Sequence, residues 1–361
     1  MANFMPKITI NFLAAAESFV SRSARGAVAV ILRDAAAKTA ALQLELKSAA
    51  DVPTELTAAN QAYLKQAFLG CSDGRVQRVF CCVLPSTATD LSNAYAWLAT
   101  KRWSWLALPP DATTEMCTAC QAWLSAQRSE NNAIYKAVLP NTDANSERIV
   151  NFVTDGIKVG SSTFSATQFC SRIAGLLAAT PITRSVTYSE LPEVEDVTRL
   201  TASAMDAAVA EGKLLAFHDG QRVRLGLGVN SLTAPDAGQT DDMKKILIME
   251  CRDMIEDDLR RLCAEQYIGK LKNTYDGRLT VLTAVREYFT TLEAQTVVQS
   301  GWSAALDASA QRAYLEAASI DVSEMTDDEV LRYDYGTSMF IAVRAKILDA
   351  IENITIAVSA G

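Results

Sequence analysis

Two cysteines have the spacing of a chemically active pair. Cys117 and Cys120 are separated by two residues, as in thiol redox centres and zinc sites. They fall inside a segment expected to be helical, no second CxxC follows, and the chain has one histidine, His218. Most of the eight cysteines lie in apolar runs such as VFCCVL, where cysteine behaves as a small core residue. We therefore expect buried thiols, without a metal or a cofactor; a zinc site would need distant ligands.

Three further motifs resemble functional sites only in part. His218 stands beside Asp219 and could act as a general base, but no nucleophile follows at a recognisable spacing, which favours a surface turn. Gly226 and Gly228 lack the third glycine of a dinucleotide-binding turn, so a bulge or close packing explains them better. The run 327–329, Asp-Asp-Glu, lacks the alternating ligands of a calcium loop and indicates a capped helix start.

Charged residues of both signs gather in one predicted helix. Apolar residues recur at helical spacing through Ile246, Ile255 and Leu262, and mixed charge between them is typical of a solvated face. An ion-paired contact between subunits is the alternative. The residues concerned are Glu256, Asp257, Asp258, Arg260 and Arg261.

Strands and helices alternate over the first 140 residues. Ala27–Leu32 is an apolar run typical of a strand covered on both faces. Helices are expected at 57–69, 90–100 and 113–129, and strands at 76–84, 103–108 and 133–139. This alternation predicts a parallel sheet covered by helices.

The loops after these strands carry the alternative function, a cytoplasmic α/β enzyme. Segments 85–90, 109–114 and 140–147 would lie at the carboxyl ends of parallel strands, where open sheets bind ligands. They are rich in helix-capping residues but contain no glycine-rich phosphate loop and no nucleophile elbow. Helix capping explains their composition without a ligand.

Two hairpins are expected beyond this region. Residues 149–153 and 157–159 flank Asp155-Gly156, and Lys213–Phe217 and Arg222–Val229 flank His218-Asp219-Gly220. The second hairpin precedes the long charged helix. Further helices are expected at 167–179, 200–210, 279–292 and 312–318, and a strand at 338–348.

Overall composition excludes several classes of protein. The 361 residues are 49% hydrophobic and 21% charged, as in ordinary globular proteins. A net charge of -8 argues against a nucleic-acid partner, whose phosphates would be repelled. The sequence shows no signal peptide and no apolar run long enough for a membrane span, so we expect a cytoplasmic protein.

Both ends of the sequence read as short strands without a local partner. Lys7–Phe12 alternates apolar and polar residues, and in Ile351–Val358 the residues Ile354, Ile356 and Val358 share one face. An unpaired strand is a template for pairing with another chain.

Three blocks of sequence, the second of them made of three segments, carry a resemblance to a known family. They are MPKITINFLAAAESFVSRSARGAVAVILRD; GQRVRLGLGVNSLT with KKILIMECRDMIEDDLRR and YIGKLKNTYDGR; and FIAVRAKILDAIENITIAV. They resemble the N-terminal arm and first strand, the most characteristic region, and the last core strand and C-terminal arm of contractile tail sheath proteins. This family occurs in myophage tails, phage-tail-like bacteriocins and defective prophage particles. Residues 35–185 match only in general layout.

The resemblance implies an α/β fold with an α+β core. We expect an N-terminal arm and linker at 1–25, an outer α/β domain at 26–185, a sheath core domain with open sheet edges at 186–348, and a C-terminal arm at 349–361. Segments 14–25 and 349–352 would be flexible linkers.

The resemblance also implies a structural, non-enzymatic function. Subunits of this family form stacked hexameric rings around an inner tail tube, contract on a baseplate signal, and drive the tube through a cell envelope. Partners would be further copies of the chain and the tube, baseplate and tail terminator proteins, in the bacterial cytoplasm during assembly and then in a released particle.

Strand exchange between neighbouring subunits supplies the predicted site residues. The arms would be Lys7, Ile8, Thr9, Ile10, Asn11 and Phe12, and Ile354, Thr355, Ile356, Ala357 and Val358. The docking hairpin at Lys213–Leu227 would receive them through Leu214, Leu215, Phe217, Val223, Leu225 and Leu227. The charges at 256–261 would change partners on contraction.

Overall fold

The computed structural model describes residues 26–38 and 40–357. These residues form two compact units, a larger one of residues 26–249 with 350–357 and a smaller one of residues 250–349. The border predicted at 185/186 lies inside the larger unit, and the division instead follows Met249.

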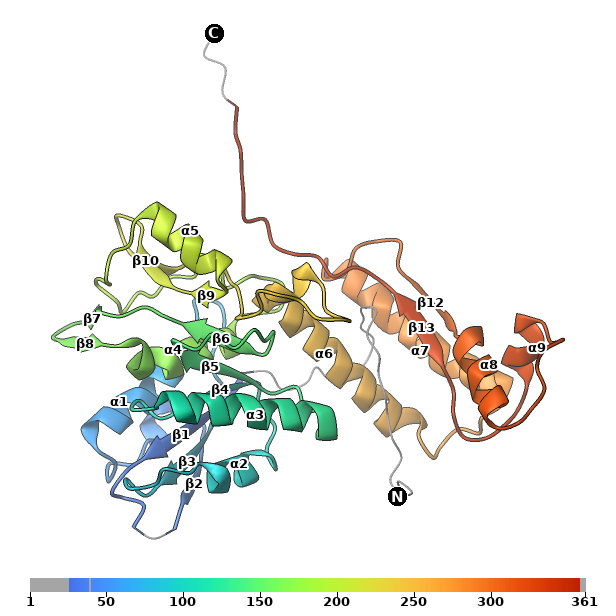
Figure 1. Ribbon diagram of the computed structural model, residues 1–361, viewed down its shortest axis with the longest axis horizontal. Helices are drawn as coiled ribbons and strands as arrows, with labels where there is room; N and C mark the ends of the chain where they lie inside the picture. The colour runs from blue at the N-terminus through green and yellow to red at the C-terminus, as the bar shows by residue number, and fades with distance from the viewer. Residues whose placement is uncertain (1–25, 39, 358–361) are drawn as a thin grey trace. The chain divides into compact units, whose positions relative to one another are not determined.

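A seven-stranded sheet organises the larger unit (Figure 1). Its order is β2-β3-β1-β4-β5-β6-β9, with β2 antiparallel to β3 and the other neighbours parallel. The strands are β1 (Ala27–Arg33), β2 (Leu42–Leu46), β3 (Arg78–Leu84), β4 (Trp105–Ala107), β5 (Lys136–Pro140), β6 (Ile149–Phe152) and β9 (Lys213–Leu214). The predicted parallel α/β layer is therefore confirmed, while the edge strand β2 was not predicted.

Helices cover both faces of this sheet. On one face, Val28, Val30 and Leu32 pack with α1 (Ala58–Ala67) and α4 (Ala166–Ala179). On the other, Ala29 and Ile31 pack with α2 (Ser92–Leu98) and α3 (Thr114–Asn131). Successive side chains of a strand point to opposite faces of the sheet. Because helices cover both faces, the apolar side chains of each strand contribute to two apolar cores.

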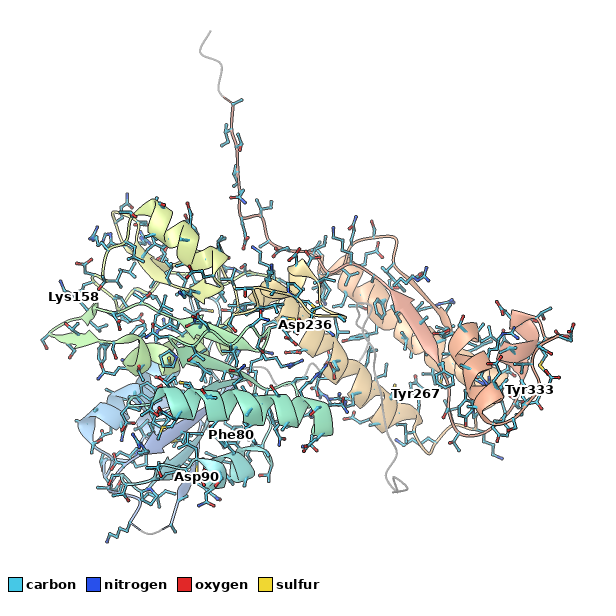
Figure 2. All side chains as sticks on the ribbon, in the orientation of Figure 1. Phe80, Asp90, Lys158, Asp236, Tyr267 and Tyr333 are labelled. Atoms are coloured by element: carbon cyan, nitrogen blue, oxygen red, sulfur yellow. The ribbon has the colours of Figure 1, made fainter. Side chains whose placement is uncertain are left out.

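Close contacts fix the helices on the sheet. Phe80 of β3, labelled in Figure 2, lies edge-on to Trp97 with ring centroids 6.3 Å apart. A Cβ atom at Gly175 of α4 would lie 2.0 Å from the carbonyl oxygen of Ala67, so only glycine allows α1 and α4 to approach so closely.

The hairpin predicted at residues 149–159 is wrong. β6 instead joins the main sheet between β5 and β9, and β7 (Ile157–Val159) pairs with β8 (Ser162–Phe164). Asp155 explains the difference, because its Oδ1 accepts a 2.8 Å hydrogen bond from the first N–H of α4 rather than closing a turn.

The second predicted hairpin is confirmed for residues 216–225, whereas Lys213 and Leu214, predicted as the start of its first strand, form β9 in the main sheet. β10 (Ala216–His218) pairs antiparallel with β11 (Val223–Leu225), and α5 (Ala202–Ala210) precedes them. The short helix η2 (Asp241–Lys244) then leads into α6 (Ile246–Leu262), which crosses the border between the units.

The smaller unit is mostly helical. After α6 and one turn of π-helix (Cys263–Tyr267) come α7 (Tyr275–Ala294), β12 (Ser303–Leu306), α8 (Ala308–Ala317), α9 (Asp327–Arg332) and β13 (Ile341–Arg344). β12 and β13 form a two-stranded antiparallel sheet. The predicted capped helix start is confirmed, because Thr326 and Glu329 form a capping box at α9. No helix in the described part of the chain has both the length and the hydropathy that a membrane span needs.

Candidate functional site

Arg33 ties together two of the loops on which the enzyme alternative depended. Its Nη1 donates to the carbonyl oxygen of Ala88 at 3.0 Å, and its Nη2 lies 2.5 Å from Oδ2 of Asp111. These partners lie in the loops after β3 and β4. The edge of the sheet that could hold a ligand is thus cross-linked by the last side chain of β1.

Asp34 is a buried carboxylate at the same edge. It is 3% exposed and accepts hydrogen bonds from Ala36 N–H, Asn60 Nδ2, and Thr57 N–H and Oγ1, all between 2.7 and 2.9 Å. Burial raises the pKa of Asp34, but these hydrogen bonds outweigh it and lower the pKa to about 2. The group therefore stays ionised and joins the end of β1 to the start of α1.

The third loop, 140–147, is joined to residues 231–234. Oδ1 of Asn145 accepts from the N–H groups of Thr233 and Ala234, each at 2.9 Å, and Ser231 Oγ donates to the carbonyl oxygen of Ser146 at 3.0 Å. Hydrogen bonds and ion pairs within the chain therefore fix all three loops.

The cysteine pair lies in the core, as predicted. Cys117 and Cys120 of α3 are 2% and 0% exposed, and burial raises the pKa of both thiols. Among the described residues, no group of three or more His, Cys, Asp or Glu side chains could hold a metal ion.

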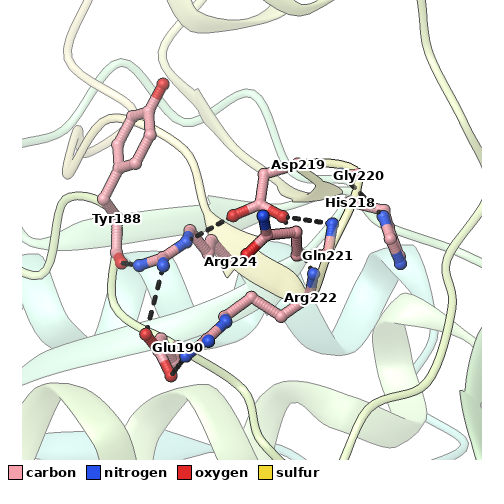
Figure 3. Close-up of polar contacts among 8 residues, drawn as sticks. All are labelled: Tyr188, Glu190, His218, Asp219, Gly220, Gln221, Arg222 and Arg224. Atoms are coloured by element: carbon pink, nitrogen blue, oxygen red, sulfur yellow. Dashed lines mark hydrogen bonds and ion pairs between the residues drawn. The ribbon is translucent and has the colours of Figure 1, made fainter.

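Asp219 and Glu190 organise the β10–β11 hairpin (Figure 3). Asp219 accepts 2.8 Å hydrogen bonds from the N–H groups of Gln221 and Arg222, and Nε of Arg224 donates to it at 2.7 Å. The backbone N–H groups and Arg224 lower the pKa of Asp219. Glu190 binds the guanidinium groups of Arg222 and Arg224 at 2.7 and 3.1 Å, which joins the preceding segment to the hairpin.

His218 belongs to this turn and not to a catalytic pair. Its Nδ1 accepts from Gly220 N–H at 2.9 Å (Figure 3). The surface-turn interpretation is therefore confirmed.

Gly228 allows close packing, as predicted. A Cβ atom there would lie 2.8 Å from Cγ2 of Val186 and 3.3 Å from Oγ1 of Thr187. At Gly226 it would come no closer than 3.4 Å to Leu215.

The predicted docking hairpin is partly engaged within its own chain. Leu214, Leu215, Val223 and Leu225 are at most 1% exposed, and Phe217 and Leu227 are half-buried. One edge of β11 is bordered by residues 188–191, since Leu225 N–H donates to Ser189 at 2.9 Å and Leu191 N–H to Val223 at 3.0 Å. In the described residues no strand borders the outer edge of β10.

The solvated face predicted for α6 is wrong. Glu256, Asp257 and Asp258 are 2%, 4% and 0% exposed. Arg260 contacts Glu256 at 2.7 Å, and Arg261 lies 3.8 Å from Asp257 and 3.7 Å from Asp258. The helix is covered around most of its circumference, so its charges are buried pairs that depend on one another.

The C-terminal arm is exposed as far as the structure describes it. Ile351, Ile354 and Ile356 are 85%, 75% and 77% exposed, and Thr355 and Ala357 are exposed too. Residues 351–357 form no helix or strand (Figure 1). Val358 and the N-terminal arm residues Lys7, Ile8, Thr9, Ile10, Asn11 and Phe12 lie outside the described residues.

Sequence reasoning missed the contacts of Glu352. One carboxylate oxygen binds the ammonium group of Lys245, and the other accepts a 2.8 Å hydrogen bond from Oγ1 of Thr187. The side chain is 9% exposed, so segment 349–352 is not the free linker that was expected. The partners lie 107 and 165 residues away, beyond the reach of any local pattern.

Comparison with known proteins agrees with this architecture. Residues 85–231 match the phage tail sheath protein central domain, and residues 238–361 match the phage tail sheath C-terminal domain. The chain is 33% identical to the tail sheath protein of Clostridium phage phiCD119 over 354 residues, covering 97% of this chain and 98% of the relative.

Two solved structures share the fold. The sheath tail protein of Desulfitobacterium hafniense matches with a TM-score of 0.70 at 14% identity, over 95% of this chain and all (100%) of that one. The contracted helical sheath of the anti-feeding prophage matches with a TM-score of 0.68 at 18% identity, over 99% of each chain.

Because the identity to the phiCD119 protein extends over nearly the whole chain, this protein belongs to the phage tail sheath family and is a structural component, not an enzyme.

Proposed function

We propose that this sheath subunit polymerises as stacked hexameric rings around an inner tail tube and contracts to drive that tube through a cell envelope. The observation that carries the proposal is the exposed C-terminal arm. Three isoleucines at 75–85% exposure on a segment without secondary structure are costly in water and gain stability when they pair with another chain. The solved anti-feeding prophage sheath, which has the same fold, is a helical assembly in the contracted state.

The arms would join neighbouring copies by strand pairing. Backbone hydrogen bonds between strands tolerate sequence differences and are directional. Such a connection can persist while the side-chain contacts between subunits are exchanged. Lys7–Phe12 and Ile354–Val358 are the proposed strands.

We propose the outer edge of β13 as an acceptor for an arm. The ladder with β12 pairs four residues of each strand and continues through a bridge between Val298 and Ile347. In the described residues no other strand borders β13. The Lys213–Leu227 hairpin stays a prediction, with β10 as its outer edge.

Other partners follow from the same function. The inner tube, the baseplate and the tail terminator would bind the assembled sheath, with no nucleic acid and no membrane insertion by this subunit. Assembly would take place in the bacterial cytoplasm before the particle is released.

Removal of the arms tests the proposal. Chains lacking residues 1–12 or residues 353–361 should fold, with the circular dichroism spectrum of the full chain, but form no tubes in electron micrographs. The full chain purified in parallel is the control. Tubes from either truncated chain would contradict exchange of the arm that the chain lacks.

A further inference from the structure

We propose that Glu352 is the residue that positions the C-terminal arm, by fixing the arm's first residues to the larger unit. Both oxygens of its carboxylate are engaged, one by Lys245 and one by Thr187. The role of Glu352 in assembly rests on the proposed arm exchange, whereas its contacts with Lys245 and Thr187 do not depend on that proposal.

The hydroxyl of Thr187 is oriented toward Glu352. Its oxygen accepts from Gly228 N–H at 2.9 Å and from Ser185 Oγ at 2.8 Å. With these donors in place, the hydroxyl proton is directed to Glu352 at 2.8 Å. Glycine at position 228 is needed because a Cβ atom would crowd Thr187 Oγ1 at 3.3 Å and Val186 at 2.8 Å.

Lys245 is held by the same part of the chain. Residue 245 forms a backbone bridge with Val229, and the next N–H, of Ile246, donates to the carbonyl oxygen of Gly228 at 2.9 Å. Both groups that hold Glu352 are therefore fixed to one short backbone segment, 228–229. All these residues belong to the larger unit.

The position of Glu352 in the chain gives this contact its role. The chain leaves the larger unit after Met249 and returns at Ala350, so Glu352 follows directly on the return. Lys245 lies just before the exit. The ion pair ties these two passages together and fixes the point from which the arm leaves.

A fixed origin limits where the arm can reach. Residue 354, the first residue of the proposed strand, can lie at most about 7 Å from residue 352 in a fully extended chain. With Glu352 held, pairing with a neighbouring strand must therefore begin close to the anchor and in a set register, whereas a loose origin would allow slipped pairings. Partly buried ion pairs with a second hydrogen-bond donor hold better than exposed ones.

Protease cleavage after Glu352 tests the anchor without assembly. Endoproteinase Glu-C should release the peptide that begins at Asn353 slowly from the unassembled full chain. Lys245→Gln should accelerate this release at least about fivefold, because the local opening becomes easier. Lys244→Gln is the matched control, since the adjacent Lys244 pairs at 2.7 Å with Asp241, which is 83% exposed. Equal release rates in the wild type and Lys245→Gln would overturn the anchor.

Charge reversal tests its role in assembly. Lys245→Glu and Glu352→Lys should each reduce the yield of tubes, and the double variant should restore it, because opposite charges again face each other. Single variants that form normal tubes, or a double variant that is no better than either, would overturn the positioning role. Tubes from the chain lacking residues 353–361 would instead overturn arm exchange and leave the Glu-C result standing, so the two failures are distinguishable.

Discussion

Nδ2 of Asn60 donates a 2.7 Å hydrogen bond to Oδ2 of Asp34 inside the larger unit, joining α1 to the end of β1. Asp34 has a pKa of about 2, below its ordinary value of 3.8. A depressed carboxylate pKa contributes stability above the unfolded pKa and loses it as the pH falls through the folded pKa. Stability should therefore decline between about pH 4 and pH 2 in part because Asp34 becomes protonated.

Asp34→Asn should remove that part of the pH dependence and lower the free energy of unfolding at pH 7 by about 2 kcal/mol. Urea unfolding at several pH values measures both effects. Asp242→Asn, at an exposed position, is the control and should leave the curve unchanged. A parallel pH profile for wild type and Asp34→Asn would contradict the assignment.

Reversal of Arg260 and Arg261 to Glu should destabilise the subunit itself. The two guanidinium groups contact carboxylates that are at most 4% exposed, and removing the partner of a buried charge costs about 3–5 kcal/mol. We expect poor solubility and a lower unfolding temperature before any assembly defect. Arg332→Glu, at an exposed ion pair with Asp328, serves as the control. A stable variant that assembles poorly would instead favour the contact between subunits.

Proline at the outer strand edges should identify the acceptor of an arm. In the β12–β13 ladder, Asp307 N–H donates to Phe340, so by alternation the N–H of Val343 points outward. In the β10–β11 hairpin, Leu225 N–H donates to Ser189 and so points away from β10. The residue that pairs with Leu225, Ala216, therefore also has its N–H directed outward, and so does His218, two residues further along β10. Proline at either position removes a donor without breaking the internal ladder.

Val343→Pro should prevent tube formation, whereas His218→Pro should allow it, because β13 is the proposed acceptor. Sedimentation and electron microscopy of folded variants provide the measurement. The reverse pattern would assign the acceptor to the predicted hairpin, and normal tubes from both variants would contradict pairing at either edge.

Gly228→Ala should reduce stability more than Gly226→Ala. The new methyl group would lie 2.8 Å from Val186 in the first case and no closer than 3.4 Å to Leu215 in the second. Overpacking of this kind costs about 1–3 kcal/mol. Thermal unfolding of the two variants side by side measures the difference, and equal losses would show that the site at 228 can relax.

The sequence predicts well those features that depend on local periodicity. β1 and β3 are recognisable because strands covered on both faces are uninterrupted apolar runs, and α3 and α7 because they have caps and helical spacing. Local periodicity does not predict which elements pair. Asp155-Gly156 looks like a hairpin turn, yet Asp155 accepts a hydrogen bond from the first N–H of α4, and β6 pairs with β5 and with β9 of the main sheet.

Sequence reasoning also failed to predict that the charged side chains of α6 are buried. The acidic and basic residues of α6 have the pattern of an exposed face, and only tertiary packing shows that Asp258 is fully buried with Tyr288 as a donor at 3.0 Å. The contacts of Glu352 with Lys245 and Thr187 were equally invisible, because a single glutamate in a short strand-like segment carries no sign of a partner over a hundred residues earlier.

Because Lys245 and Glu352 lie far apart in the chain, the contact between them can form only late in synthesis. The ribosome adds about 5–20 residues per second, so the 107 residues between them require roughly 5–20 s. During that interval Lys245 and Thr187 have emerged but Glu352 does not yet exist. The arm's origin can therefore be set only on a nearly finished chain, and a nascent or prematurely terminated subunit would lack a correctly placed arm to offer a neighbour.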